Sequence, residues 1–262
     1  MIMTDTQNHE GAGQPMPGPL RGTLNGVIMR LTLRATMSRR RAILFALPAI
    51  ILIGISALLK AKAHGTAWPP EVLSILGYLI LALTALIVGG SVLGAEMDDG
   101  SILHLLATPV SRRTIVLSKY VVAVGLTAVF AAIPVYLAGV IATGASSHLA
   151  IGLFVGALAG AVIYNALFLL LTAVFSPGPA LAIGLLYILV WENLLASLVP
   201  GVGLLSAEHY SLAVANSIAH NSQLHANVNF GTGVGMGAAV TVLALAYAVV
   251  SLSGFNVKGD LA

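Results

Sequence analysis

Long apolar runs without charged residues alternate with short polar segments along the chain, and the length of each run predicts a membrane-spanning helix. An α-helix rises about 1.5 Å per residue, so roughly 20 residues cross about 30 Å of hydrocarbon. The uncharged stretch from Tyr120 to Trp191 is longer than one crossing, and turn signals at 144–148 and 176–179 divide it. The runs predict six spans, at about 42–59, 72–95, 115–143, 149–175, 180–199 and 233–253.

A helix with two different faces is predicted ahead of the first span, at about 24–40. Arg30 and Arg34 lie on one face, whereas apolar side chains recur at helical spacing on another. Such a helix can bind anionic headgroups in the membrane interface, or it can act as an elbow that contacts a cytoplasmic partner. The apolar positions are Leu24, Val27, Ile28, Leu31 and Ala35.

The basic residues predict the orientation of the chain in the membrane. With six crossings both termini lie on one side, and of the Lys and Arg residues only Lys60 and Lys62 fall on the other. The positive-inside rule therefore predicts cytoplasmic termini. Residues 1–20, rich in Pro and Gly, are expected to form a disordered tail, followed by one transmembrane domain over 21–262. The first apolar run begins too late for a signal peptide, so the first span is expected to be retained.

Composition supports an all-α integral membrane protein. The chain is 58% hydrophobic and 8% charged, with a mean hydropathy of +0.98, which a water-facing surface could not cover. Its net charge of +3 is explained by membrane topology, so no nucleic-acid partner is expected. The absence of cysteine excludes disulfides, iron–sulfur clusters and thiolate metal sites.

A short charged island lies between the second and third predicted spans, from Glu96 to Lys119. Asp98, Asp99 and Ser101 favour a helix start and Pro109 favours its end, which predicts a helix over about 101–107. This helix is too short to cross the membrane and too apolar to stay uncovered, so lipid, a neighbouring loop or a partner protein must cover it. Its apolar residues are Ile102, Leu105 and Leu106.

The motif in this island is Glu96-x-x-x-Gly100-x-x-x-x-Leu105-Leu106-x-x-Pro109-Val110-Ser111-Arg112, followed by Lys119. An elbow helix precedes it, six spans surround it, and a long external segment separates the last two spans. In motif and layout the chain resembles ABC-2 type transporter permeases from about residue 21 onward. Within that family it is similar to the nitrous-oxide-reductase maturation permease and to natural-product exporter permeases.

The resemblance implies that the helix at 101–107 is a coupling helix, which inserts into a groove of a separate ATP-binding subunit with the elbow helix nearby. Leu105 and Leu106 would anchor it inside a charged rim. The residues assigned to ATPase coupling are Glu96, Asp99, Gly100, Leu105, Leu106, Pro109, Arg112 and Arg113, and the elbow helix contributes Arg30 and Arg34.

The resemblance also implies the partners. The chain has no Gly-x-x-x-x-Gly-Lys-Ser/Thr loop, so no cofactor is expected here, and ATP and Mg would bind the partner ATPase. We expect two ATP-binding subunits, a second permease copy or a homologous permease, and the lipid bilayer of a bacterial-type inner (plasma) membrane. A soluble partner on the external side of the membrane is a further alternative.

Glu192 lies inside the fifth predicted span, where a carboxylate is costly. It is therefore expected to be protonated, paired or facing water in a pathway. Tyr164, Asn165 and Tyr187 are candidates for the same pathway, or for ordinary hydrogen bonds between helices.

The segment from Pro200 to Thr232 is too polar to span the membrane and too long for a simple turn. Residues 206–219 can form a capped helix, either re-entrant or interfacial. The histidines at 209, 220 and 225 match no standard metal-ligand spacing, and no metal site is predicted. In the fourth span, Gly152, Gly156 and Gly160 predict a helix-packing face, either internal or between protomers.

Three functional classes can be compared. A membrane-embedded lipid-modifying enzyme should show converging catalytic side chains, but the acidic cluster here is Glu96, Asp98 and Asp99 alone. An ion-coupled secondary transporter needs more intramembrane charge than Glu192 provides. We therefore predict a non-catalytic permease subunit of an ATP-driven transporter. It would export a hydrophobic or amphipathic substrate, or transmit mechanical work to an external partner; the substrate itself is not predicted.

Overall fold

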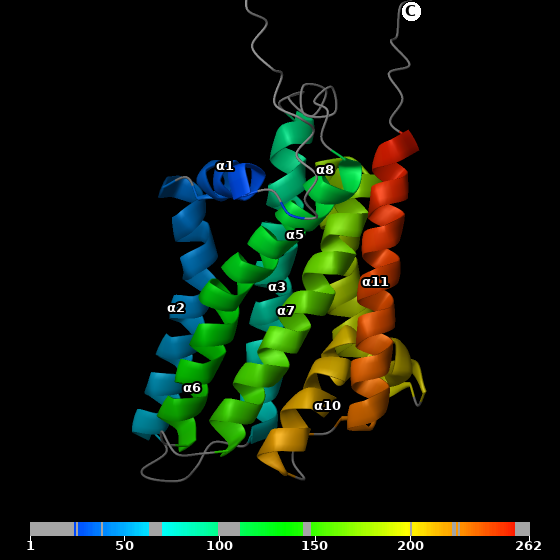
Figure 1. Cartoon of the computed structure of the whole chain (residues 1–262). Coiled ribbons are helices and arrows are strands. Elements are labelled where there is room, and N and C mark those ends of the chain that lie inside the picture. Colours follow the sequence, from blue (N-terminus) through cyan, green and yellow to red (C-terminus); the bar gives the residue numbers. More distant parts are fainter. Residues whose placement is uncertain are drawn as a thin grey trace, which may run out of the picture.

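The computed structural model describes residues 24, 26–37, 39–62, 70–98, 111–143, 148–199, 201–221, 224 and 226–254. Within these ranges every regular element is a helix. The long helices run side by side as one bundle, and the short helix α1 (Gly26–Thr36) lies across one end of it (Figure 1). The end of the last helix, α11 (Phe230–Gly254), lies at the same end as α1. An all-α membrane protein is therefore confirmed.

The bundle contains five helices long and apolar enough to cross a membrane, among the residues described. These five are α3 (Pro70–Asp98), α5 (Arg112–Thr127) with α6 (Ile133–Thr143), α7 (His148–Val174), α8 (Pro177–Leu186) with its continuation to Leu195, and α11. The bundle also contains α2 (Arg39–Lys62). A π-helical turn, η1 (Ala128–Ala132), joins α5 to α6. In α2 the apolar stretch, Ala42–Leu58, is shorter than the other five. The count of six spans thus stays a prediction.

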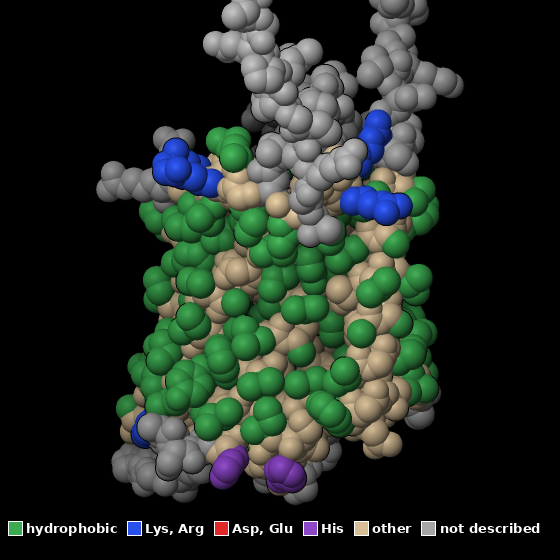
Figure 2. Space-filling view, in the orientation of Figure 1, with side chains coloured by type: hydrophobic (Ala, Val, Ile, Leu, Met, Phe, Trp, Pro, Cys, Tyr) green, Lys and Arg blue, Asp and Glu red, His purple; other side chains and the backbone are tan. Residues whose placement is uncertain are grey.

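The surface of the bundle is divided into an apolar middle and two polar ends. Figure 2 shows hydrophobic side chains over the middle of the visible face, with most of the visible Lys and Arg at the end that carries α1 and His at the opposite end. The exposed large side chains of the middle include Ile50, Val242 and Leu243. A belt of this kind is stable only against lipid, so the belt marks the depth of the membrane.

The elbow helix α1 turns one row of side chains toward the bundle. Ile28, Thr32 and Thr36, spaced four apart, are buried against the bundle, which α1 contacts mainly through α5. Val27 and Leu31 are 63% and 60% exposed, so they face outward, where lipid would lie. Arg30 and Arg34 are exposed as well.

The core forms around α7, which contacts α3, α6 and α11. Aromatic and aliphatic side chains fill the space between these helices, among them Tyr78, Leu81, Leu153 and Phe168. Because the buried face of α7 carries many Gly and Ala residues, its neighbours approach closely. A helix with many small side chains on its buried face therefore lies at the centre.

The external segment folds back along α7 as the helix α10 (Ala207–Ala219). A Cβ added to Gly152 would lie 2.6 Å from the main-chain oxygen of Ala215, and one added to Gly160 would lie 2.8 Å from the hydroxyl of Ser211. These pairs show that α10 runs antiparallel to α7. The glycine stripe is thus an internal packing face, which decides between the two predicted alternatives.

This contact also fixes the depth of α10. Gly160 lies about 18 Å along α7 from its first residue, His148, at about 1.5 Å per residue. The N-terminus of α10 is packed near this level, and its C-terminal end lies near the start of α7. The helix is therefore re-entrant, with its N-terminal end inside the bundle.

Candidate functional site

The predicted coupling segment is mostly outside the described residues. Asp99, Gly100, Leu105, Leu106 and Pro109 all fall there, and Glu96 lies in α3 without a described side chain. The coupling helix over 101–107 therefore stays a prediction. What the structure does describe is the pair of helices on either side of it, α3 and α5.

Helix α5 begins directly after this segment. The hydroxyl oxygen of Ser111 accepts a hydrogen bond from the main-chain N–H of Thr114 at 3.2 Å and so caps the helix. The guanidinium of Arg112 donates to the main-chain oxygen of Leu252, near the end of α11. The positive charge of Arg112 is also stabilised by the negative, C-terminal end of the α11 helix dipole. The side chain of Arg113 is exposed.

Lys119 is fully buried, although the sequence suggested only a basic residue near the membrane interface. Its side-chain nitrogen donates to the main-chain oxygen of Val92 at 2.8 Å. The bond joins α5 to the last part of α3, so it ties together the two helices that flank the predicted coupling segment. In the sequence, Lys119 stands out only because it follows the motif shortly after Arg112.

Glu192 is the buried acid at the other end of the bundle. It lies in a π-helical stretch, η2 (Tyr187–Leu195), which continues α8 and passes into α9 (Ala196–Leu198). The side chain is 3% exposed. The hydroxyl of Tyr187 donates to its Oε1 atom at 2.5 Å. The carboxyl is thus hydrogen-bonded within its own helix.

The rest of the Glu192 carboxyl is bound by the start of α10, after the short 3-10 helix η3 (Val202–Leu205). The hydroxyl of Ser206 and the main-chain N–H of Glu208 donate to Oε2, the latter at 3.4 Å. The main-chain N–H of Ala207 donates to Oε1 at 2.9 Å. The sequence predicted a helix start at Ser206, but only the fold brings Ser206, Ala207 and Glu208 to Glu192.

The other candidate pathway residues divide between two places. Tyr164 stacks on Phe168 with ring centroids 5.8 Å apart, and Phe168 meets the ring of Tyr187 at 6.4 Å. These rings form one wall beside Glu192. Asn165 instead donates to the hydroxyl of Thr127 at 2.9 Å and joins α7 to α5. The structure therefore groups Tyr187 and Tyr164 near Glu192 and places Asn165 in a separate connection.

A polar cavity of about 340 Å³ lies beside the start of α10. Burial, together with the nearby Glu192 charge, raises the pKa of Glu208 to about 8. His209 also lines this cavity, whereas His220 ends α10 in a left-handed conformation and His225 lies outside the described residues. In the described part of the chain no three potential ligands cluster for a metal. The lining residues are Glu71, Ser74, Ile75, Glu192, Asn193, Glu208, His209, Leu212 and Asn227.

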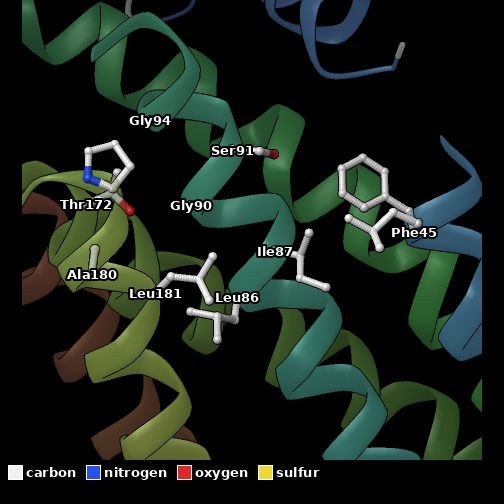
Figure 3. A pocket seen from close by; sticks show the side chains of 11 residues that line it. Phe45, Leu86, Ile87, Gly90, Ser91, Gly94, Thr172, Ala180 and Leu181 are labelled. Carbon is white, nitrogen blue, oxygen red and sulfur yellow. The ribbon is translucent and has the colours of Figure 1, made fainter. Parts of the chain in front are cut away.

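An apolar groove of about 220 Å³ lies nearer the α1 end, between α2, α3 and α8. Figure 3 shows Phe45 of α2 on one side, Leu181 and Ala180 of α8 on the other, and Gly90 and Gly94 of α3 between them. At Gly90 the helix α3 presents no side chain to the groove, and the nearest atom to an added Cβ there is the Thr172 hydroxyl at 3.9 Å. An apolar chain fits such a lining better than a charged group does.

Comparison with known proteins gives one family. A family profile described as "ABC-2 family transporter protein" matches residues 37–206. The match begins just before α2 and ends at Ser206, so it contains the predicted coupling segment, Glu192 and the residue that caps α10. A search of proteins of curated function finds no match.

Proposed function

Because this chain belongs to the ABC-2 family of transporter proteins, we propose that it is the membrane subunit of an ATP-driven exporter for a hydrophobic or amphipathic substrate. Family membership makes it a non-catalytic transmembrane subunit whose ATP hydrolysis is supplied by a separate ABC ATP-binding subunit. It also removes the two alternatives, a lipid-modifying enzyme and an ion-coupled secondary transporter. Similarity to particular members, such as the nitrous-oxide-reductase maturation permease, stays a prediction.

The apolar groove between α2, α3 and α8 is the observation that supports a hydrophobic or amphipathic substrate. Its lining is mainly hydrocarbon, and its polar side-chain groups are the hydroxyls of Ser91 and Thr172. Both hydroxyls donate within their own helices, to Val88 and Phe168 respectively. An acyl chain or an apolar ring could occupy the groove without leaving a polar group unsatisfied.

Transmission of mechanical work to an external partner is the second candidate. The observation in its favour is the direct bonding of Glu192, in span five, to the re-entrant helix α10. Displacement of the span could thereby reach the external surface without passage of a substrate.

The proposed ATPase contact is the segment between α3 and α5. Leu105 and Leu106 would fill a groove of the ATP-binding subunit, with Glu96, Asp99 and Arg113 at its rim and Gly100 and Pro109 shaping the segment. Two such subunits, carrying ATP and Mg, would serve two permease copies. The concentration of basic side chains at the α1 end supports cytoplasmic termini in a bacterial-type inner membrane.

Copurification with a Walker-loop ATPase tests this contact. Leu105→Asp or Leu106→Asp should abolish the association while membrane insertion persists, because a carboxylate cannot enter an apolar groove. Leu105→Met is the matched control and should keep the ATPase bound, since it conserves the apolar volume. Association that survives both Asp variants would contradict the assignment.

The substrate class is tested with the assembled complex. Hydrophobic and amphipathic compounds, including the bilayer's own phospholipids, should stimulate ATP hydrolysis. Gly90→Leu should reduce this stimulation by filling the groove, whereas Gly125→Leu, at an exposed position where no atom lies within 4 Å of an added Cβ, should not. Equal stimulation in both variants would exclude the groove as the binding site.

A further inference from the structure

We propose that Glu192 is a positioning residue that fastens the re-entrant helix α10 to span five, so that the two move as one body. The inference rests on the proposed function, because it assigns the step by which motion of span five would reach the external end of the protein. The residues that form the fastening are Tyr187, Glu192, Ser206, Ala207 and Glu208.

All four partners of the Glu192 carboxyl group donate hydrogen to it. Two are main-chain N–H groups, and the Tyr187 hydroxyl donates to Oε1. The hydroxyl oxygen of Ser206 already accepts from the main-chain N–H of His209 at 3.2 Å, so its own hydrogen is available for Oε2. An ionised carboxylate, an acceptor-only group with two oxygens, satisfies all four of these donors.

The start of α10 needs such a partner because it lies inside the bundle. The first N–H groups of a helix have no partner within the helix. Ser206 satisfies one of them as the helix cap. Glu192 accepts hydrogen bonds from the N–H groups of Ala207 and Glu208. Its negative charge is attracted to the positive, N-terminal end of the α10 helix dipole.

The π-helical form of η2 contributes to the same connection. A π-helical turn contains more residues than an α-helical turn, so it rotates the side chains that follow it. Here Glu192 points inward, and the indole N–H of Trp191 donates to the main-chain oxygen of Leu205 at 3.2 Å. Two successive side chains of span five thus hold the segment that leads into α10. The carboxylate is the charged one, so its loss should matter more.

Apolar packing also holds α10 against the bundle. Small side chains such as Ala213 and Ala215 face glycines of α7 and α11, including Gly152, Gly156 and Gly233. Tyr210 and Leu212 are buried in the main hydrophobic core. Apolar packing is non-directional, whereas hydrogen bonds are directional. The bonds to Glu192 are therefore what fixes the start of α10 relative to span five.

The absence of cysteine in the native chain permits a direct measurement. Ser211→Cys places a thiol of similar size on the fully buried face of α10. In the purified full-length protein, Glu192→Gln should increase the rate of maleimide labelling at this thiol by about fivefold or more, the size expected when a helix loses its cap. Ser206→Ala, a milder change, should act in the same direction.

Glu71→Gln is the matched control, because it makes the same chemical change in the same cavity but on α3. It should leave the labelling rate unchanged. A rate unaffected by both Glu192→Gln and Ser206→Ala would overturn the proposal, as would an equal increase in Glu71→Gln.

Coupled motion is tested in the complex with the ATP-binding subunit. Leu198→Cys reports on the end of span five and Ser217→Cys reports on α10, each labelled with a membrane-impermeant maleimide with and without ATP. ATP should change both rates in the otherwise unaltered chain. With Glu192→Gln, ATP should still change the rate at position 198 but no longer the rate at position 217.

The outcomes separate the two levels of inference. If α10 still responds to ATP in Glu192→Gln, the fastening role is wrong and the proposed function stands. If ATP changes neither reporter while the ATPase remains bound, ATP-driven motion of span five is wrong, and the proposed function fails. The labelling of Ser211→Cys, which needs no ATP, then still decides whether Glu192 holds α10.

Discussion

The side-chain nitrogen of Lys119 donates to the main-chain oxygen of Val92 at 2.8 Å, and the lysine is fully buried. These residues belong to α5 and α3, the helices that enclose the predicted coupling segment. Force applied to that segment would therefore reach both helices together. The same end of α5 is tied to α11 through Arg112 and Leu252.

Lys119→Met should lower the midpoint of thermal unfolding of the protein in detergent. Methionine keeps the apolar length of the side chain but cannot donate to Val92, and a lost buried hydrogen bond costs about 1–3 kcal/mol. Lys60→Met, at an exposed site, is the control and should have little effect. Shifts of equal size in the two variants would show that the Lys119 bond contributes nothing.

Gly156→Ala should weaken the docking of α10 strongly. The added Cβ would lie 2.7 Å from the main-chain oxygen of Ser211 and 2.8 Å from the Cβ of Ala215, so one helix must move. Overpacking of this kind costs about 1–3 kcal/mol. Gly125→Ala meets no atom within 4 Å and should be neutral or slightly stabilising. Thermal unfolding of both variants is the measurement, and a harmless Gly156→Ala would contradict the close packing.

The free energy of unfolding should decrease as the pH rises from about 4.5 to about 8, because of Glu208. Its pKa in the folded protein, about 8, lies above the ordinary 4.5, so the folded state keeps a proton that the unfolded state releases in this window. The contribution of Glu208 to the stability of the folded state is fully present below about pH 4.5 and is lost as the pH rises to about 8. Glu71, Glu192 and His209 face the same cavity, and Glu192 carries the charge that opposes ionisation.

Glu208→Gln isolates this contribution. The variant should show a flatter dependence of the unfolding midpoint on pH than the native chain over the same window, because the glutamine does not titrate. An unchanged slope would mean that Glu208 ionises normally in the folded protein.

Arg112 and Arg113 should give opposite results although they are adjacent. Arg112→Ala should lower the unfolding midpoint, since its guanidinium binds the end of α11. Arg113→Ala should leave stability unchanged, because the side chain is exposed, and should weaken binding of the ATP-binding subunit. Thermal unfolding and copurification, measured on both variants, test this separation. Loss of stability in Arg113→Ala would refute it.

The sequence alone determined the class of the protein and the approximate position of its helices. A membrane span satisfies its own backbone hydrogen bonds, so its length and polarity can be read locally, as at 72–95 and 149–175. Local chemistry also predicted the start of α10, because Ser206 followed by a helical pattern is a capping signal. The motif from Glu96 to Arg112 then led to the family that the profile match confirms.

Only the tertiary structure decided which polar groups meet. Glu192 and Ser206 are 14 residues apart, and Lys119 and Val92 are 27 apart. Both contacts depend on the rotation of each helix, and that of Glu192 depends also on the π-helical turn in η2; apolar periodicity encodes neither. The role of Gly152, Gly156 and Gly160 was undecided for the same reason. A small-residue stripe shows that something packs closely, and the fold identifies α10 as that partner because its backbone fills the space.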